Sequence, residues 1–223
     1  MVKMLFIDLG NVVVTFNDRA AWLEKIVKSF GGKTEALSRM FEPVADGKPA
    51  ETRYRKIDLG EIDLNDLYRI VTDEAGVDRA KLPFEAFASL YVSHIRLIPE
   101  VAEVLRGVTA PIVVVSNGDF CSVHALNLLL AEGGVKVHRY FISCQHGATK
   151  PKIFSQVIRK WLQEQNVDVR NSLYVDDLPG HCDECTNICR IPHFCFDARK
   201  QKVSELHWEI YLRQLIPYTP SLR

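Results

Sequence analysis

Five short, mainly apolar segments place the strongest constraint on how this chain of 223 residues can fold. The segments are "VKMLFI" before Asp8, "PIVVV" before Ser116, "RYFIS" before Cys144, "SLYV" before Asp176 and "HFCF" before Asp197. Runs of this kind are typical of strands that are covered on both faces, and the spacing between them leaves room for crossover helices. The sequence therefore predicts an α/β fold with a doubly wound parallel sheet.

A long segment between the first two of these runs, residues 16–92, is helical in pattern and contains no comparable strand. Its helical stretches are "RAAWLEKIVKSF", "TEALSRMFEPV", "IDLNDLYRIVTDEAG" with Asp63 or Asn65 as the N-cap, and "LPFEAFASLYVSHI". We expect two domains, a core of residues 1–15 and 93–223 and a helical insert of residues 16–92. Further helices are predicted at "TKPKIFSQVIRKWLQEQ" and "KVSELHWEIYLRQLI", and the tail "PYTPSLR" is expected to fray.

The composition excludes several classes of partner. Lys and Arg together number 28, as do Asp and Glu, so no net charge draws the chain to nucleic acid or to an anionic membrane. No stretch approaches the ~20 apolar residues of a membrane span. A short apolar start without a small-residue cleavage site predicts no signal peptide, and the cysteine spacing does not resemble a secreted disulfide framework. We expect a cytoplasmic protein, either a monomer or a homodimer.

Polar residues with complementary chemistry follow the predicted strands. Asp8, Ser116 and the pair Asp176-Asp177 come directly after apolar runs, and Lys150 begins the helix that follows another run. Ligands of open parallel sheets bind beyond the carboxyl ends of the strands, so these groups are expected to converge.

The predicted group contains carboxylates, a hydroxyl and an ammonium, which suits phosphoryl transfer. Carboxylates placed close together repel one another unless a cation lies among them, and Mg²⁺ prefers hard oxygen ligands together with a substrate phosphate. Asp8 is the candidate nucleophile, which would form an aspartyl-phosphate and divide hydrolysis into two displacements. Ser116 and nearby backbone N–H groups would bind phosphoryl oxygens, and Lys150 would neutralise charge in the transition state.

Four motifs in this order resemble those of the haloacid dehalogenase superfamily. They are "FIDLGNVV" with Asp8, "IVVVSNGD" with Ser116, "GATKPKIF" with Lys150 and "LYVDDLPG" with Asp176 and Asp177. A single such motif is weak evidence, but the ordered set spans nearly the whole chain. Within the superfamily, the sequence is similar to small sugar-phosphate phosphatases, including those acting on glucose 1-phosphate, and to the phosphatase domain of soluble epoxide hydrolases.

The resemblance implies a Rossmann-like core whose helical insert is a cap that closes over the substrate. It implies an Mg²⁺ site formed by Asp8, the backbone carbonyl of Gly10, Asp176 and Asp177, with Asp177 favoured over Asp176 as a direct ligand. It also implies a phosphate site formed by Ser116, Asn117, Gly118 and Lys150. The expected activity is Mg²⁺-dependent hydrolysis of a small phosphorylated metabolite, such as a sugar phosphate.

Gly10 departs from the pattern of most phosphatases in this superfamily. They have a second Asp two residues after the nucleophile, which protonates the leaving group and then activates water. General acid–base help is typically worth ~10² to 10⁴ in rate. The absence of the second Asp is compatible with slow turnover, with a substrate that has a good leaving group, or with no turnover. The glucose 1-phosphate phosphatases carry the same Gly, and an anomeric phosphate has a less basic leaving group than a simple alkyl phosphate.

Two rival functions remain open, and a third is disfavoured. A silent member would bind a phosphorylated ligand or a protein partner without turnover, and a second enzymatic rival is a nucleotide phosphatase. Superfamily dehalogenases also lack the second Asp, but they need no metal, and the pair Asp176-Asp177 argues against them.

The cysteines of "HCDECTNIC" raise the question of a zinc or iron–sulfur site. Cys182, Cys185 and Cys189 would lie on one helical stripe, where cysteine packs as a small apolar residue, and we favour core packing over metal binding. No role is predicted for Arg19 or His94.

Overall fold

A computed structural model describes residues 2–16, 18–37 and 53–216, with backbone only at residues 53 and 54. Most of the helix expected at "TEALSRMFEPV" and the expected fraying of "PYTPSLR" lie outside the described residues.

All five predicted strands form one parallel sheet. They are β1 (Leu5–Ile7), β4 (Ile112–Ser116), β5 (Val137–Ile142), β6 (Leu173–Asp176) and β7 (His193–Cys195). Their order across the sheet is β5-β4-β1-β6-β7, and every adjacent pair is parallel. Because the chain turns to opposite sides of the central β1, the sheet has the switch point of a doubly wound fold. The predicted fold class is confirmed.

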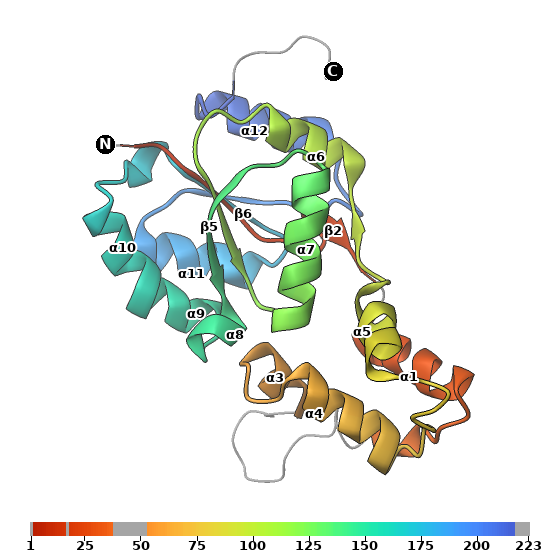
Figure 1. Cartoon of the computed structure of the whole chain (residues 1–223). Helices are drawn as coiled ribbons and strands as arrows, with labels where there is room; N and C mark the ends of the chain where they lie inside the picture. The colour runs from red at the N-terminus through yellow and green to blue at the C-terminus, as the bar shows by residue number, and fades with distance from the viewer. Residues whose placement is uncertain (1, 17, 38–52, 217–223) are drawn as a thin grey trace.

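Helices cover both faces of this sheet (Figure 1). Leu5 and Ile7 face a core shared with α6 (Pro99–Arg106), α7 (Phe120–Glu132) and α12 (Val203–Leu212). Phe6 points to the other side, where it packs with α9 (Lys150–Ile153), η2 (Phe154–Ile158), α10 (Arg159–Glu164) and α11 (Pro179–Cys189). Successive side chains of a strand point to opposite faces, so apolar residues at every position supply both cores.

The helices described between residues 16 and 92 pack around a core of their own (Figure 1). They are α1 (Arg19–Ser29), α3 (Arg53–Asp58), α4 (Leu64–Arg69), η1 (Ile70–Glu74) and α5 (Phe84–Val92). An antiparallel pair, β2 (Val14–Thr15) and β3 (Arg96–Leu97), flanks them in the chain. The division into domains at residues 16 and 92 stays a prediction.

The helix ends follow local chemistry. Asp63, rather than Asn65, caps α4, because its carboxylate accepts from the Asp66 N–H while the Asp66 side chain accepts from the Asp63 N–H. Two helices predicted as regular contain π-helical turns, η1 and η2, which the apolar pattern alone did not reveal. The remaining short elements are α8 (Ser143–His146) and the 3₁₀ turn η3 (Val169–Asn171).

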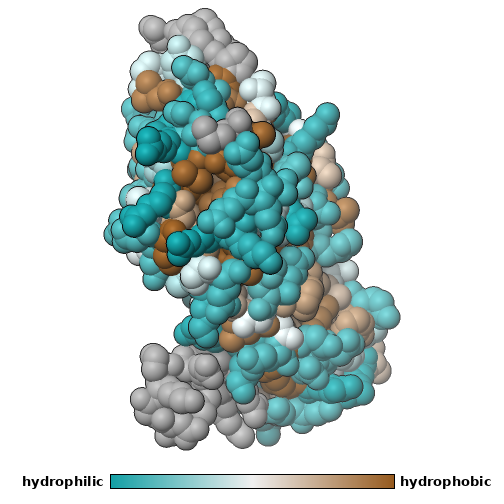
Figure 2. All heavy atoms as spheres, turned by 90° about the vertical axis from the view of Figure 1, so that its left-hand side faces the viewer, coloured by the Kyte–Doolittle hydropathy of each residue, from teal (hydrophilic) through white to brown (hydrophobic). Residues whose placement is uncertain are grey.

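The outer face over α10 and α11 is mainly hydrophilic, with a hydrophobic patch (Figure 2). A hollow of about 630 Å³ lies there, lined by residues of α10 and α11 and of the segments that lead into β6 and β7. None of the predicted site residues lines it. Among the described residues, no helix combines the length and the apolar character needed to cross a membrane.

Candidate functional site

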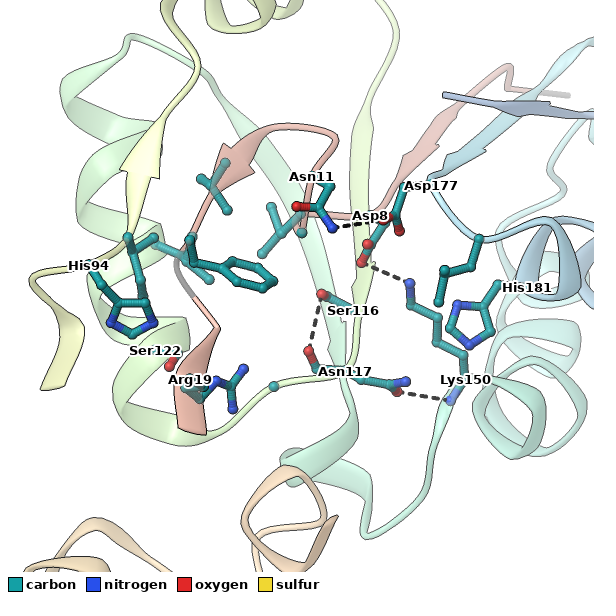
Figure 3. Close-up of a pocket in the computed structure, with 18 residues that line it drawn as sticks. Asp8, Asn11, Arg19, His94, Ser116, Asn117, Ser122, Lys150, Asp177 and His181 are labelled. Carbon is teal, nitrogen blue, oxygen red and sulfur yellow. Dashed lines mark hydrogen bonds and ion pairs between the residues drawn. The ribbon is translucent and has the colours of Figure 1, made fainter. Parts of the chain in front are cut away.

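The predicted site residues meet at the carboxyl ends of three adjacent strands. Asp8 follows the central strand β1, while Ser116 ends β4 and Asp176 ends β6, the two strands paired with β1. Lys150 is the first residue of α9. A cavity of about 240 Å³ opens above them, and its lining includes Asp8, Gly10, Ser116, Asn117, Gly118, Lys150 and Asp177 (Figure 3). The predicted convergence is confirmed.

Negative charge is concentrated at the buried end of these strands. The residues there, Asp8, Lys150, Asp176 and Asp177, are called the strand-end cluster. Nζ of Lys150 lies 2.8 Å from Oδ1 of Asp8 and 2.6 Å from Oδ2 of Asp176. One carboxylate oxygen from each of the three acids lies within 4.8 Å of the others. Lys150 balances one of the three negative charges, and the half-exposed guanidinium of Arg199 lies 3.9 Å from Asp177 but is itself paired with Asp197. Oxygen ligands and the remaining negative charge therefore both favour a divalent cation among the acids.

Burial and mutual contact shift the pKa values of this cluster. Burial raises the pKa of Asp8, and the Asp176 carboxylate raises it further, against the ammonium of Lys150, which lowers it. Burial also opposes the charge of Lys150, but the carboxylates of Asp8 and Asp176 raise its pKa above the ordinary value. A cation beside Asp8 would lower the pKa of that carboxyl and keep it ionised for attack.

Hydrogen bonds fix Asp176 more firmly than Asp8. Asp176 is fully buried and accepts from Nζ of Lys150, the hydroxyl of Tyr174 and the N–H of Leu178. Burial works against its ionisation, but His181, Lys150 and Tyr174 hold the pKa of Asp176 well below its usual range. Oδ1 of Asp8 is paired with Nζ of Lys150 at 2.8 Å, and Asp8 lines the cavity whereas Asp176 does not. Of these two acids, Asp8 is therefore the one placed to meet a ligand.

Asn11 is a site residue that the sequence analysis missed. Its Nδ2 donates to Oδ2 of Asp177 at 2.8 Å, which orients that carboxylate toward the cavity (Figure 3). Asn11 has a φ of 55°, a left-handed conformation that Asn tolerates better than most residues. The sequence did contain a signal for this role, because Asn11 is a polar residue directly after Gly10, whose carbonyl was expected to face the metal.

Two hydrogen bonds tie the segment after β4 to the starts of α8 and α9. Oδ1 of Asn117 accepts from the backbone N–H of Lys150 at 3.1 Å, which ties the end of β4 to the start of α9. The N–H of Gly118 donates to Oγ of Ser143 at 2.9 Å. Gly118 lines the cavity, but its N–H, expected to bind a phosphoryl oxygen, is already engaged.

Gly10 lies at the cavity wall beneath the ring of Phe16. A Cβ at position 10 would lie 3.0 Å from Cε1 and 3.1 Å from Cζ of Phe16, and 3.7 Å from Oδ2 of Asp8. The φ of Gly10 is not positive, so the backbone itself would accept another residue. The Phe16 ring occupies the space that a side chain at position 10 would need.

The other end of the cavity contains a second group of charges that the sequence did not predict. Figure 3 shows Arg19, Ser122 and His94 on the opposite side of Ser116 from Lys150 and Asp177. NH1 of Arg19 lies 3.1 Å from Oδ1 of Asp58 and 3.3 Å from Oδ2 of Asp119, and these three residues are called the Arg19 cluster below.

Asp119 in the Arg19 cluster is fully hydrogen-bonded. It is the N-cap of α7, where it accepts from the N–H and hydroxyl of Ser122, and it also accepts from the hydroxyl of Tyr91. His94 lies nearby and is buried, and burial lowers the pKa of its imidazole, so it is neutral at neutral pH.

The cysteines of α11 pack as predicted. Cys182, Cys185 and Cys189 are buried and form no disulfide. Among the described residues, the group with metal-binding geometry is Asp8, Asp176 and Asp177.

Comparison with solved structures identifies the fold. A HAD-family enzyme from Bacteroides thetaiotaomicron, crystallised with magnesium and inorganic phosphate, aligns with a TM-score of 0.68 at 15% identity, over 92% of this chain and 99% of that one. A protein from Porphyromonas gingivalis, described as a predicted HAD-like family hydrolase, aligns with a TM-score of 0.67 at 14% identity, over 94% and 98%. No family model and no curated protein matches the chain. The chain has the haloacid dehalogenase fold.

This fold is shared by an enzyme crystallised with magnesium and inorganic phosphate and by dehalogenases. A 2-haloacid dehalogenase from Pseudomonas syringae also aligns, with a TM-score of 0.55 at 17% identity, over 90% of this chain and 89% of that one. The choice between the two chemistries therefore depends on the residues of the site and not on the fold.

Proposed function

We propose that the protein is a Mg²⁺-dependent phosphoric monoester hydrolase that acts on a small phosphorylated metabolite through an aspartyl-phosphate on Asp8. The observation that carries the proposal is the strand-end cluster, where three carboxylates lie within 4.8 Å of one another beside one ammonium. This arrangement leaves excess negative charge in a buried cavity that would have to accept an anionic substrate, so a cation is required.

Asp8, Asp176 and Asp177 fit Mg²⁺ because all three offer hard oxygen ligands. When bound, the ion neutralises the carboxylates and the phosphoryl oxygens and stabilises charge in the transition state. Asp177 is the better direct ligand, because Asp176 already accepts three hydrogen bonds. The crystals of the Bacteroides thetaiotaomicron enzyme with magnesium and inorganic phosphate support the assignment.

Each remaining residue has a separate task in the proposed reaction. A carboxylate oxygen of Asp8 attacks phosphorus, the ester P–O bond breaks, and the leaving alkoxide takes a proton from water. Water then attacks the phosphoryl group on Asp8, which releases phosphate and restores the carboxylate. Ser116 and Asn117 bind phosphoryl oxygens, and Lys150 stabilises their charge while it holds Asp8 in place. The helices between residues 16 and 92 form the cap over the cavity.

Cavity size and charge argue against two of the rivals. At about 240 Å³ the cavity is smaller than the ~300–1,000 Å³ typical of small-molecule sites, which disfavours a nucleotide. Three acids would repel the carboxylate of a haloacid in the absence of a cation, which disfavours dehalogenation. A silent phosphate-binding protein remains the second candidate, because Gly10 leaves no acid beside the leaving group.

The test is hydrolysis of acetyl phosphate and of a panel of phosphate monoesters, with Mg²⁺ and with EDTA. We expect Mg²⁺-dependent release of phosphate that falls at least ~10³-fold in Asp8→Asn. Asp183→Asn, a change at an exposed acid on α11, is the matched control and should retain the activity. Hydrolysis that survives Asp8→Asn would contradict the covalent mechanism, and phosphate binding without hydrolysis would favour the silent candidate.

A further inference from the structure

The aromatic ring of Phe16 lies against Gly10, the position at which the usual acid is missing. A Cβ on Gly10 would lie 3.0 Å from that ring and 3.7 Å from Oδ2 of Asp8. The ring therefore borders the space in which the side chain of the usual acid would begin, next to the group proposed to attack phosphorus. A leaving group that extends into this space meets a hydrocarbon face in place of a proton donor.

The cavity beyond Phe16 is mainly apolar. Its lining there comes from β2, from the segment after α5 and from α7, and includes Val14, Ile95 and Leu126. The ring of His94 lies 6.5 Å from the Phe16 ring, centroid to centroid, at an interplanar angle of 76°. Because burial lowers the pKa of His94, this second ring is also uncharged.

The charged and hydroxyl groups at this end of the cavity are engaged with one another, and among the described residues Nδ1 of the buried His94 is the polar atom here without a hydrogen bond. Arg19 is paired with Asp58 and Asp119, and the hydroxyl of Ser122 donates to Asp119 at 2.7 Å. A sugar would bring several hydroxyl groups into this space, and each would lose hydrogen bonds to water without an equivalent replacement. The lining instead suits a flat, apolar group.

We propose that the substrate is a small aryl phosphate, whose ring packs against Phe16 while its phosphate lies beside Asp8 and Lys150. The inference rests on the proposed hydrolase function and deepens it. Attack of Asp8 breaks the bond between phosphorus and the phenolic oxygen, and the electron pair leaves with that oxygen as a phenolate. A phenolate is much less basic than an alkoxide and takes its proton from water after departure, so the missing acid at position 10 is not needed.

The test separates recognition of the ring from the ease of bond breaking. Phenylphosphonate and cyclohexylphosphonate are not hydrolysed, so their inhibition constants against acetyl phosphate hydrolysis, with Mg²⁺ present, report recognition alone. We expect phenylphosphonate to bind about tenfold more tightly than cyclohexylphosphonate. Among substrates, kcat/KM for phenyl phosphate should exceed that for glucose 1-phosphate.

Variants of Phe16 test whether its ring causes the preference for phenylphosphonate over cyclohexylphosphonate. Phe16→Ala and Phe16→Leu should both remove the tenfold preference, since neither retains an aromatic face, and Phe16 is exposed enough for both to fold. Leu212→Ala, at an exposed apolar residue of α12, is the control that should retain the preference. Equal inhibition by the two phosphonates, or a preference that survives Phe16→Ala, would overturn the inference.

Failure of the hydrolase function gives a different result. If acetyl phosphate is not hydrolysed at all, the hydrolase proposal fails, and the two phosphonates are then compared by calorimetry in the presence of Mg²⁺. A phenyl preference that depends on Phe16 would still support the ring site, and equal affinities would overturn it.

Discussion

The strand-end cluster and the Arg19 cluster contain similar charges at opposite ends of one cavity. Each places a cationic side chain between two carboxylates, Lys150 between Asp8 and Asp176, and Arg19 between Asp58 and Asp119. The strand-end cluster adds a third acid, and two of its three acids, Asp8 and Asp177, line the cavity. Asp119, by contrast, accepts from two hydroxyls, a backbone N–H and a guanidinium.

The difference shows that charge composition alone does not make a site. Hydrogen bonds satisfy Asp119 where it lies, so the Arg19 cluster can hold α1, α3 and α7 together without any further ion. The strand-end cluster has more carboxylates than cations, and two of those carboxylates line the cavity, which is the condition under which a cation gains most from binding. The same comparison predicts how the two clusters respond to substitution.

The largest contrast is expected when the cation of each cluster is removed. Lys150→Met leaves two buried carboxylates without their ammonium and should lower the free energy of unfolding by about 3–5 kcal/mol in EDTA. Saturating Mg²⁺ should restore part of this loss, since it replaces the missing positive charge. Arg19→Met should cost about 1–3 kcal/mol, with no recovery in Mg²⁺. Denaturant unfolding with and without Mg²⁺ measures the stability loss of each variant. If Mg²⁺ also restored stability to Arg19→Met, the two clusters would not differ in the way described.

Magnesium itself should distinguish the acids of the two clusters. At a concentration 100-fold above its Kd, Mg²⁺ should raise the free energy of unfolding of the unmodified protein by about 2.7 kcal/mol. Asp177→Asn should remove most of this gain, while Asp119→Asn should keep it despite a lower starting stability. The comparison is measured by thermal unfolding across a Mg²⁺ titration, and equal loss of the gain in both variants would count against the metal site.

A matched pair of tyrosines gives a smaller and more selective test. The hydroxyl of Tyr174 donates to Asp176, and the hydroxyl of Tyr91 donates to Asp119. Changing either to Phe removes one hydrogen bond to a carboxylate and should cost about 2 kcal/mol of stability. Tyr174→Phe should also weaken Mg²⁺ binding about tenfold, since groups that orient metal ligands affect metal affinity. Calorimetric titration with Mg²⁺ should find the affinity of Tyr91→Phe unchanged.

The smallest effect expected is a pH dependence from Asp58. Burial raises the pKa of Asp58 above its ordinary value of 3.8, against the guanidinium of Arg19. A raised pKa in the folded state means that this group contributes most stability below the unfolded pKa and loses it as the pH rises through the folded pKa. The stability of the unmodified protein relative to Asp58→Asn should therefore fall as the pH rises above the ordinary pKa of an aspartate. Denaturant unfolding in EDTA checks the sign, and a relative stability that rises with pH would contradict it.

The sheet and the strand-end cluster were predictable because their signals are local. Asp8, Ser116 and Asp176 each end an apolar run, and parallel strands bring their carboxyl ends to one edge. Lys150 was predictable in the same way from its position at a helix start. Each prediction needed only the pattern around the residue and a general rule for parallel sheets.

The Arg19 cluster and the Phe16 ring were not predictable in this way. Arg19, Asp58 and Asp119 lie far apart in the sequence, and an arginine on a helix gives no sign of the acids that it will meet. The contact between Phe16 and Gly10 depends on the turn between β1 and β2. The role expected for the Gly118 N–H overlooked Ser143, which begins α8 after a different strand.

The phosphorylated state of Asp8 tests the central claim most directly. Gly10 provides no base to activate water for the second displacement, so the aspartyl-phosphate should form faster than it is hydrolysed and should accumulate. Acid quenching during turnover of phenyl phosphate or acetyl phosphate with Mg²⁺, followed by mass spectrometry of the peptides, measures it. The account predicts one added phosphoryl group on the peptide that contains Asp8, absent in EDTA and in Asp8→Asn. Phosphate release with no phosphoryl group on Asp8, or with the group on another residue, would contradict the account.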